Sequence, residues 1–260
     1  MKVFLRQVGA LVRLSFLELW RRNDVLGLAI LAVAVMVPLA CANPFGASGA
    51  SRYLDEMALL LVWAFSLFVS LGTASRLFPP EFEGRTVYPL FAKPVSRGRV
   101  LLGKYLGAVC ASWSALVVFY ALFAGAVVLR GGSVAHLELA QAFVLHLGFA
   151  ALAVAAALFG SLVVTRSANL TLVGIVFVAM FFFGRKLPAY AESASGVAAW
   201  AVRAAYAILP HVEFFDMRQR VIHGWGAVDG AVFLAVLLYG AIYVAILLGL
   251  SAVVLGRKRI

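Results

Sequence analysis

The sequence predicts an all-α membrane protein that crosses the bilayer several times. Of its 260 residues, 64% are hydrophobic and only 13% are charged, whereas soluble domains average about half apolar and about a quarter charged. The apolar residues form long continuous runs. Every backbone polar group inside a bilayer must be satisfied, and the strands of membrane barrels alternate apolar and polar residues. Continuous runs therefore predict helices.

Residues 1–23 are too rich in charge to cross the membrane. Apolar side chains recur in this segment near helical spacing, with basic groups between them, which is typical of an amphipathic helix in the cytoplasmic interface. A solvated helical stalk is the alternative interpretation.

Six apolar runs follow, and a helix needs about 20 such residues to span the hydrocarbon core. They occupy residues 25–42, 57–74, 105–129, 139–164, 170–184 and 231–255. The fifth run is short for a span. Six spans with the N-terminus inside place most of the 22 Lys and Arg residues on the cytoplasmic side, as the positive-inside rule requires. We therefore expect both termini in the cytoplasm and the chain in the inner (cytoplasmic) membrane.

The net charge of +11 does not indicate a nucleic-acid partner. The basic residues are dispersed at the ends of apolar runs, where membrane orientation and lipid headgroups account for them. Cys41 and Cys110 lie in different apolar runs, and no His–Cys cluster has ligand spacing. We therefore expect neither a disulfide nor a metal site, and membrane lipid as the surrounding partner.

The loop at 79–104, between the second and third runs, is the main polar interval in the N-terminal half. Its residue order predicts a short docking helix, with a capping group, an apolar face, a terminating proline and an arginine-rich exit. A purely orienting basic loop would explain the charge but not this order.

Motifs of this loop resemble the permeases of ABC-2-type transporters. They are Glu81 and Glu83, Thr86, the run Lys93-Pro94-Val95-Ser96-Arg97, and Leu101-Leu102-Gly103-Lys104. One departure is Arg85, which separates Gly84 from Thr86 where the family form has Gly directly before Thr. The resemblance implies a six-span, type V exporter-like permease with an N-terminal interfacial helix.

In that family the loop is a coupling helix that seats in a separate ATPase subunit. The resemblance thereby assigns ATPase contacts to Glu83, Arg85, Thr86, Leu90, Phe91, Lys93, Pro94, Val95 and Arg97. It also implies pairing with a second permease copy or a homologue. ATP and magnesium would be held by the ATPase partner, with no cofactor in this chain.

The chain itself shows no signature of an ATP site. Gly98–Lys104 matches part of the phosphate-binding loop pattern, but Tyr105 stands where Ser or Thr should reach magnesium. We expect no catalytic residues.

Residues 185–229 form the longest connection and read as two short helices broken at Pro210, half-embedded at the outer face. The resemblance favours a re-entrant segment, and an ordinary periplasmic loop is the alternative. Candidate residues of an outer gate are Pro210, Glu213, Phe214 and Asp216. His211 with Glu213 and Asp216 falls short of a metal or acid–base site.

His146 is the ionisable residue deepest in a predicted span, where it serves a function or joins two helices by a hydrogen bond. Gly103 and Gly107 give the third span a small-residue face for close packing.

We expect the transmembrane permease subunit of an ATP-driven exporter, with an unidentified substrate that is amphiphilic or lipid-linked. A secondary transporter would need more ionisable groups at the midplane and inverted repeats. An intramembrane enzyme would need paired catalytic groups. A non-transporting scaffold subunit remains an alternative.

Overall fold

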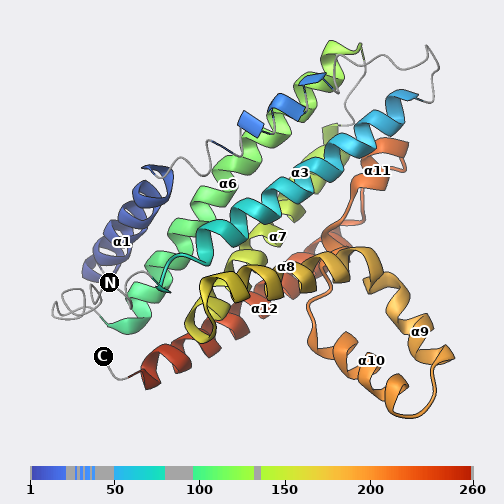
Figure 1. Cartoon of the computed structure of the whole chain (residues 1–260). Helices are drawn as coiled ribbons and strands as arrows, with labels where there is room; N and C mark the ends of the chain where they lie inside the picture. The colour runs from blue at the N-terminus through green and yellow to red at the C-terminus, as the bar shows by residue number, and fades with distance from the viewer. Residues whose placement is uncertain are drawn as a thin grey trace.

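The computed structural model describes residues 2–21, 27, 30–31, 33–35, 37–38, 50–79, 96–131 and 136–258. All regular elements in these residues are helical, which confirms the all-α prediction (Figure 1). The long helices are α1 (Lys2–Arg21), α3 (Ala50–Ala74), α6 (Arg97–Leu129), α7 (His136–Val163), α8 (Arg166–Phe183) and α12 (Gly230–Arg257).

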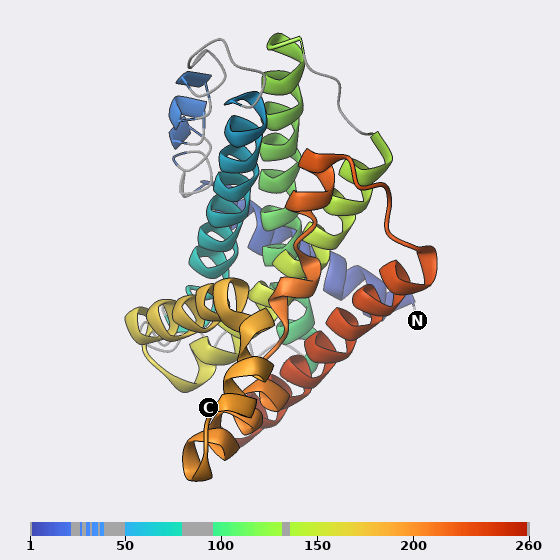
Figure 2. The ribbon, with the colours of Figure 1, turned by 90° about the vertical axis from the view of Figure 1, so that its right-hand side faces the viewer.

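Shorter helices connect α8 to α12. They are η2 (Gly184–Lys186), α9 (Leu187–Ser193), α10 (Gly196–Ile208), η3 (Val212–Phe215) and α11 (Arg218–His223). Helices α9 and α10 extend beyond the bundle of long helices (Figures 1 and 2). α10 ends next to Pro210, where the sequence predicts a break.

Five helical stretches in the described residues are long and apolar enough to cross a membrane. They are Arg52–Ala74, Arg97–Leu129, Leu137–Val163, Arg166–Ser193 and Gly230–Arg257. The predicted first span, 25–42, lies largely outside the described residues, so the count of six stays a prediction. The stretch Arg166–Ser193 is longer than the predicted fifth run, 170–184, because η2 and α9 continue α8.

The starts of two helices differ from the sequence prediction by seven or eight residues. α3 begins at Ala50 rather than at 57, and α6 begins at Arg97 rather than at 105. The predicted coupling loop of 79–104 therefore ends at Ser96. The prediction was wrong because it assigned charged residues to loops, whereas their side chains bond neighbouring elements from within the helix ends.

The core lies between α3, α6 and α7, with α12 packed along α7 and α1 packed along α6. Phe149 and Leu152 of α7 are fully buried in it. In contrast, most of α12 is exposed, and only Gly240, Ser251 and Leu255 are buried among its residues. A long apolar helix with an exposed surface is expected where lipid or another protein covers it.

Candidate functional site

The structure describes one of the nine predicted ATPase-contact residues. Glu83, Arg85, Thr86, Leu90, Phe91, Lys93, Pro94 and Val95 lie outside the described residues. Arg97 is described, as the first residue of α6.

Arg97 joins the beginning of α6 to the end of α12. Its Nη1 atom lies 2.9 Å from the carbonyl oxygens of Leu255 and Gly256 and 3.1 Å from that of Lys258. These carbonyls belong to the last turn of α12, which has no further backbone donors of its own. A cation at this end also complements the helix dipole. Arg97 thus caps α12 within the same chain.

Two more basic residues of α6 bond other elements in the same way. Arg99 Nη1 donates to Gln7 Oε1 of α1 at 2.7 Å. Lys104 Nζ donates to the Leu77 carbonyl, just after α3, at 2.6 Å and lies 5.0 Å from the centre of the Phe78 ring. We call Arg97, Arg99 and Lys104 the α6 junction. It connects α6 to α12, α1 and the end of α3.

The small-residue face of α6 receives α1. A Cβ atom at Gly103 would collide with Leu11. A Cβ atom at Gly107 would lie 2.6 Å from Ser15 Cβ and 3.1 Å from the Val12 carbonyl oxygen. The two glycines, four residues apart, therefore let the helix backbones approach closely.

The four candidate outer-gate residues lie between α10 and α11. The backbone N–H of His211, next to Pro210, donates to the Tyr239 hydroxyl at 2.8 Å. Tyr239 is nine residues from the start of α12, or about 14 Å along it. Phe214 is 45% exposed and packs edge-on against Tyr239.

Glu213 is buried without matching donors. Its side chain is 1% exposed, and neither carboxylate oxygen has a hydrogen-bond partner among the described residues. His211 Nδ1 lies 3.4 Å from Oε1, and Arg185 donates to the Glu213 backbone carbonyl rather than to the carboxylate. The carboxylate covers Gly184, where a Cβ atom would lie within 2.5 Å of it. Burial raises the pKa of Glu213, partly offset by His211 and Arg185.

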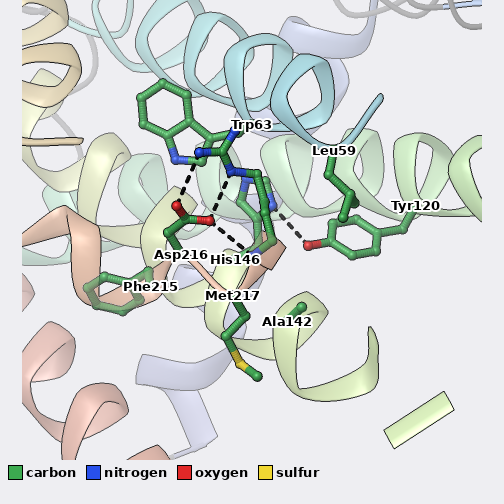
Figure 3. A pocket seen from close by; sticks show the side chains of 9 residues that line it. Leu59, Trp63, Tyr120, Ala142, His146, Phe215, Asp216 and Met217 are labelled. Carbon is green, nitrogen blue, oxygen red and sulfur yellow. Dashed lines mark hydrogen bonds and ion pairs between the residues drawn. The ribbon is translucent and has the colours of Figure 1, made fainter. Parts of the chain in front are cut away.

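Asp216 forms an ion pair with Arg218. Asp216 Oδ1 accepts from Arg218 Nε at 2.9 Å and from its backbone N–H at 3.1 Å, and Oδ2 accepts from Nη2 at 3.2 Å (Figure 3). The guanidinium also lies over the Phe181 ring of α8, 4.6 Å from its centre, and Phe181 stacks on Trp63 of α3. This pair therefore fixes the start of α11 against α3 and α8.

His146 lies beside this ion pair and joins three long helices (Figure 3). Ser66 Oγ donates its proton to the Trp63 carbonyl at 2.8 Å, so it must accept from His146 Nε2 at 2.6 Å. Nδ1 then accepts from the Tyr120 hydroxyl at 3.2 Å. Both ring nitrogens of a neutral imidazole are satisfied by this arrangement, which corresponds to the helix–helix bond that the sequence offered as one interpretation.

A small cavity of about 20 Å³ separates the His146 group from the ion pair. That volume accommodates about one water molecule. Its polar lining comes from Tyr120, His146, Asp216 and Arg218, which can supply the partners that a buried water needs. The cavity lies in the half of the molecule opposite the α6 junction.

Sequence reasoning did not select Trp63, Ser66, Tyr120, Phe181 or Arg218. Their partners come from helices far apart in the chain, so no local motif marks them. Arg218 alone carried a signal, as a cation two residues after Asp216.

Comparison with known families gives a match over most of the chain. A family model described as ABC-2 family transporter protein matches residues 16–185. This range includes the last residues of α1 and extends through α3, α6, α7 and α8. A search of curated protein sequences finds no match to the chain.

Proposed function

Since the chain belongs to the ABC-2 transporter family, we propose that it is the permease subunit of an ATP-driven exporter, with hydrolysis supplied by a separate ATPase subunit. The family is a membrane transport component and is not itself catalytic. The observation that carries the proposal is the family match over residues 16–185, together with five apolar helices of membrane-spanning length in the described residues.

The ATPase would dock on the segment between α3 and α6. By resemblance, Glu83, Arg85, Thr86, Leu90, Phe91, Lys93, Pro94 and Val95 supply the contacts. Arg97 takes a different role in this proposal, since its guanidinium already caps α12. It would pass a displacement of the docking segment to α12 through the α6 junction.

The α6 junction can transmit a displacement only if the docking segment makes different contacts in two states of the ATPase. The junction supports this mechanism because its three cations bond three separate elements. A shift of the α6 N-terminus would therefore act on α1, α3 and α12 together.

The outer gate of the proposed pathway would lie between α10 and α11, at Pro210, Glu213, Phe214 and Asp216. The bond from His211 to Tyr239 supports a re-entrant path, because it lies about 14 Å along α12 from the helix start. The ion pair of Asp216 with Arg218 would fasten the closed state against α3 and α8.

The exposed apolar surface of α12 supports pairing with a second permease copy or a homologue. The apolar character of the spans favours an amphiphilic or lipid-linked cargo. The charge distribution favours an inner-membrane protein with both termini in the cytoplasm. The α6 N-terminus and the α12 C-terminus meet at one end of the molecule, which agrees with that orientation (Figure 1).

The first test is purification of the protein from native membranes in mild detergent, comparing wild type with Phe91→Asp. The matched control is Trp225→Asp, which makes the same kind of change at a 63% exposed side chain between α11 and α12. Arg97 is left intact in both variants because its loss would also disturb α12.

We expect an ATPase subunit to copurify with wild type and with Trp225→Asp, and to be lost from Phe91→Asp. Copurification that survives Phe91→Asp would refute the docking assignment. The absence of any ATPase from wild type would refute the ATP-driven exporter and favour a secondary transporter or a scaffold subunit.

A further inference from the structure

A lateral apolar groove lies between α7, α8 and α12 and is separate from the His146 cavity and the α6 junction. Its volume is about 480 Å³. The three helices supply its walls, and Ile208, Leu209 and Pro210 close one end. Its rim includes Leu172, Ile246 and Leu250, which are 46–56% exposed. Because the walls are helices of membrane-spanning length, the groove opens toward hydrocarbon rather than toward water.

The groove has the length expected for part of one leaflet. Along α8 it extends from Asn169 to Phe177, eight residues or about 12 Å. One leaflet contributes about 15 Å of hydrocarbon, half of the core thickness. The end at Asn169 and Val164 adjoins the short turn between α7 and α8, which the charge distribution places on the cytoplasmic side.

That end of the groove is suited to an anion. α8 begins at Arg166, and its N-cap residue Thr165 makes no side-chain capping bond. The first backbone N–H groups of a helix have no intrahelical acceptor and bind phosphate or carboxylate readily. Thr165, Arg166 and Ser167 are all exposed here. A cation and uncapped backbone donors thus lie at the mouth of an apolar groove.

Asn169 is a polar side chain in the lining of the groove. Its side chain is 0% exposed and lines the groove. Nδ2 donates to the Ala157 carbonyl at 2.7 Å, whereas Oδ1 has no hydrogen-bond donor among the described residues. Buried polar atoms without a partner are rare. Oδ1 lies against Gly160 of α7, where an added Cβ atom would collide with it, so Asn169 holds α8 close to α7 at this end of the groove.

We propose that this groove binds one anionic glycerophospholipid of the cytoplasmic leaflet. The phosphate lies at the N-terminus of α8 beside Arg166, and one acyl chain fills the groove up to Leu209 and Pro210. The described side chains leave the space between α8 and α12 unfilled. A bound lipid would fill it and hold the two helices at a fixed distance. The inference depends on the membrane orientation but not on an ATPase partner.

The test is native mass spectrometry of the purified full chain, delipidated and then titrated with 1-palmitoyl-2-oleoyl-phosphatidylglycerol or with the matching phosphatidylcholine. Val176→Trp fills the groove, and Val178→Trp is its control because Val178 is on the same helix, exposed and outside the groove. Arg166→Gln removes the cation, and Arg13→Gln is its control on the exposed side of α1.

We expect wild type to retain one phosphatidylglycerol per chain and to prefer it over phosphatidylcholine. Val176→Trp should lose this binding, while Val178→Trp keeps it. Arg166→Gln should lower the affinity for phosphatidylglycerol about fivefold, since one basic residue near an anionic surface contributes about that factor, and Arg13→Gln should not.

Three results would overturn the proposal. They are equal retention by Val176→Trp and Val178→Trp, equal affinity of wild type for both lipids, and a lipid-free wild-type dimer that Val176→Trp converts to a monomer. The last result would assign the groove to a second copy of the chain. None of them depends on ATPase copurification, so this inference and the exporter proposal can fail separately.

Discussion

The Arg97 guanidinium lies 2.9 Å from the Leu255 carbonyl, which joins the first residue of α6 to the last turn of α12 across 158 positions of sequence. The same nitrogen also reaches Gly256 and Lys258. The contact places the C-terminal end of α12 beside the first residue of α6. It gives α12, which has few buried residues of its own, a fixed attachment at one end.

Replacing Arg97 with Gln should release the C-terminal turn of α12. A hydrogen bond from a charged group contributes about 1.5–3 kcal/mol, and the partial exposure of Arg97 favours the lower end of that range. We expect faster amide hydrogen exchange over residues 251–258, measured by mass spectrometry. Arg99→Gln is the control, since the Arg99 guanidinium bonds Gln7 of α1. Unchanged exchange in Arg97→Gln would contradict the capping role.

Replacing Gly103 with Ala should force α1 away from α6. The added methyl group would collide with Leu11, and overpacking of this kind costs about 1–3 kcal/mol. The midpoint of thermal unfolding in detergent should fall, and protease should cut α1 more readily. Gly125→Ala on the same helix is the control because nothing lies within 4 Å of its Cβ position. That variant should be as stable as wild type or slightly more stable, because Ala favours helix over Gly.

The helical class and five spans could be predicted because a long apolar run predicts a membrane-spanning helix whatever the run packs against. The start of α6 could not. Arg97, Arg99 and Lys104 resemble loop residues until their acceptors are known, and those acceptors lie in α12, α1 and the end of α3. Long basic side chains commonly reach past an apolar surface to such acceptors.

The candidate site was predictable to a similar degree. His146 is conspicuous in any apolar run, and Asp216 follows a proline break. Ser66 and Tyr120 are not conspicuous, since serine and tyrosine are ordinary in such helices. They acquire a role only when α3, α6 and α7 pack together. The sequence therefore predicts where a polar group lies in a helix but not which residues of other helices bond it.

Replacing His146 and Ser66 singly and together should show that the bond between them stabilises the protein. We expect His146→Leu and Ser66→Ala each to lower the free energy of unfolding. The double variant should lose less than the sum, because either change alone already breaks the shared bond. Hydrogen bonds between membrane helices have coupling energies of about 0.6 kcal/mol on average in such cycles, so a value near 0.6 kcal/mol is expected. Thermal or denaturant unfolding of the four proteins in one detergent gives this value.

The control for that cycle pairs His146→Leu with Ser114→Ala. Ser114 bonds only the Ala111 carbonyl on its own helix. Its effect should add to that of His146→Leu without a coupling energy. Coupling of equal size in both cycles would show that His146→Leu disturbs the helices generally, and the specific bond would be refuted.

Glu213 should make the stability of the protein depend on pH. Burial raises its pKa in the folded state above the ordinary value of 4.5, so the folded protein binds this proton more tightly than the unfolded chain does. The free energy of unfolding should therefore fall as pH rises from about 4.5 through the raised folded pKa. Glu213→Gln keeps the shape of the side chain and cannot ionise. It should remove this fall and be at least as stable as wild type at pH 7.

The control for Glu213→Gln is an exposed glutamate in the same connection between α8 and α12. Glu192→Gln provides it, because Glu192 is exposed at the end of α9. The pH profile of that variant should follow wild type. His211 and Arg185 face Glu213 and oppose the shift, so Arg185→Gln should steepen the fall. If Glu213→Gln unfolds with the same pH profile as wild type, the carboxylate is hydrated in the folded protein, and the raised pKa attributed to its burial would be refuted.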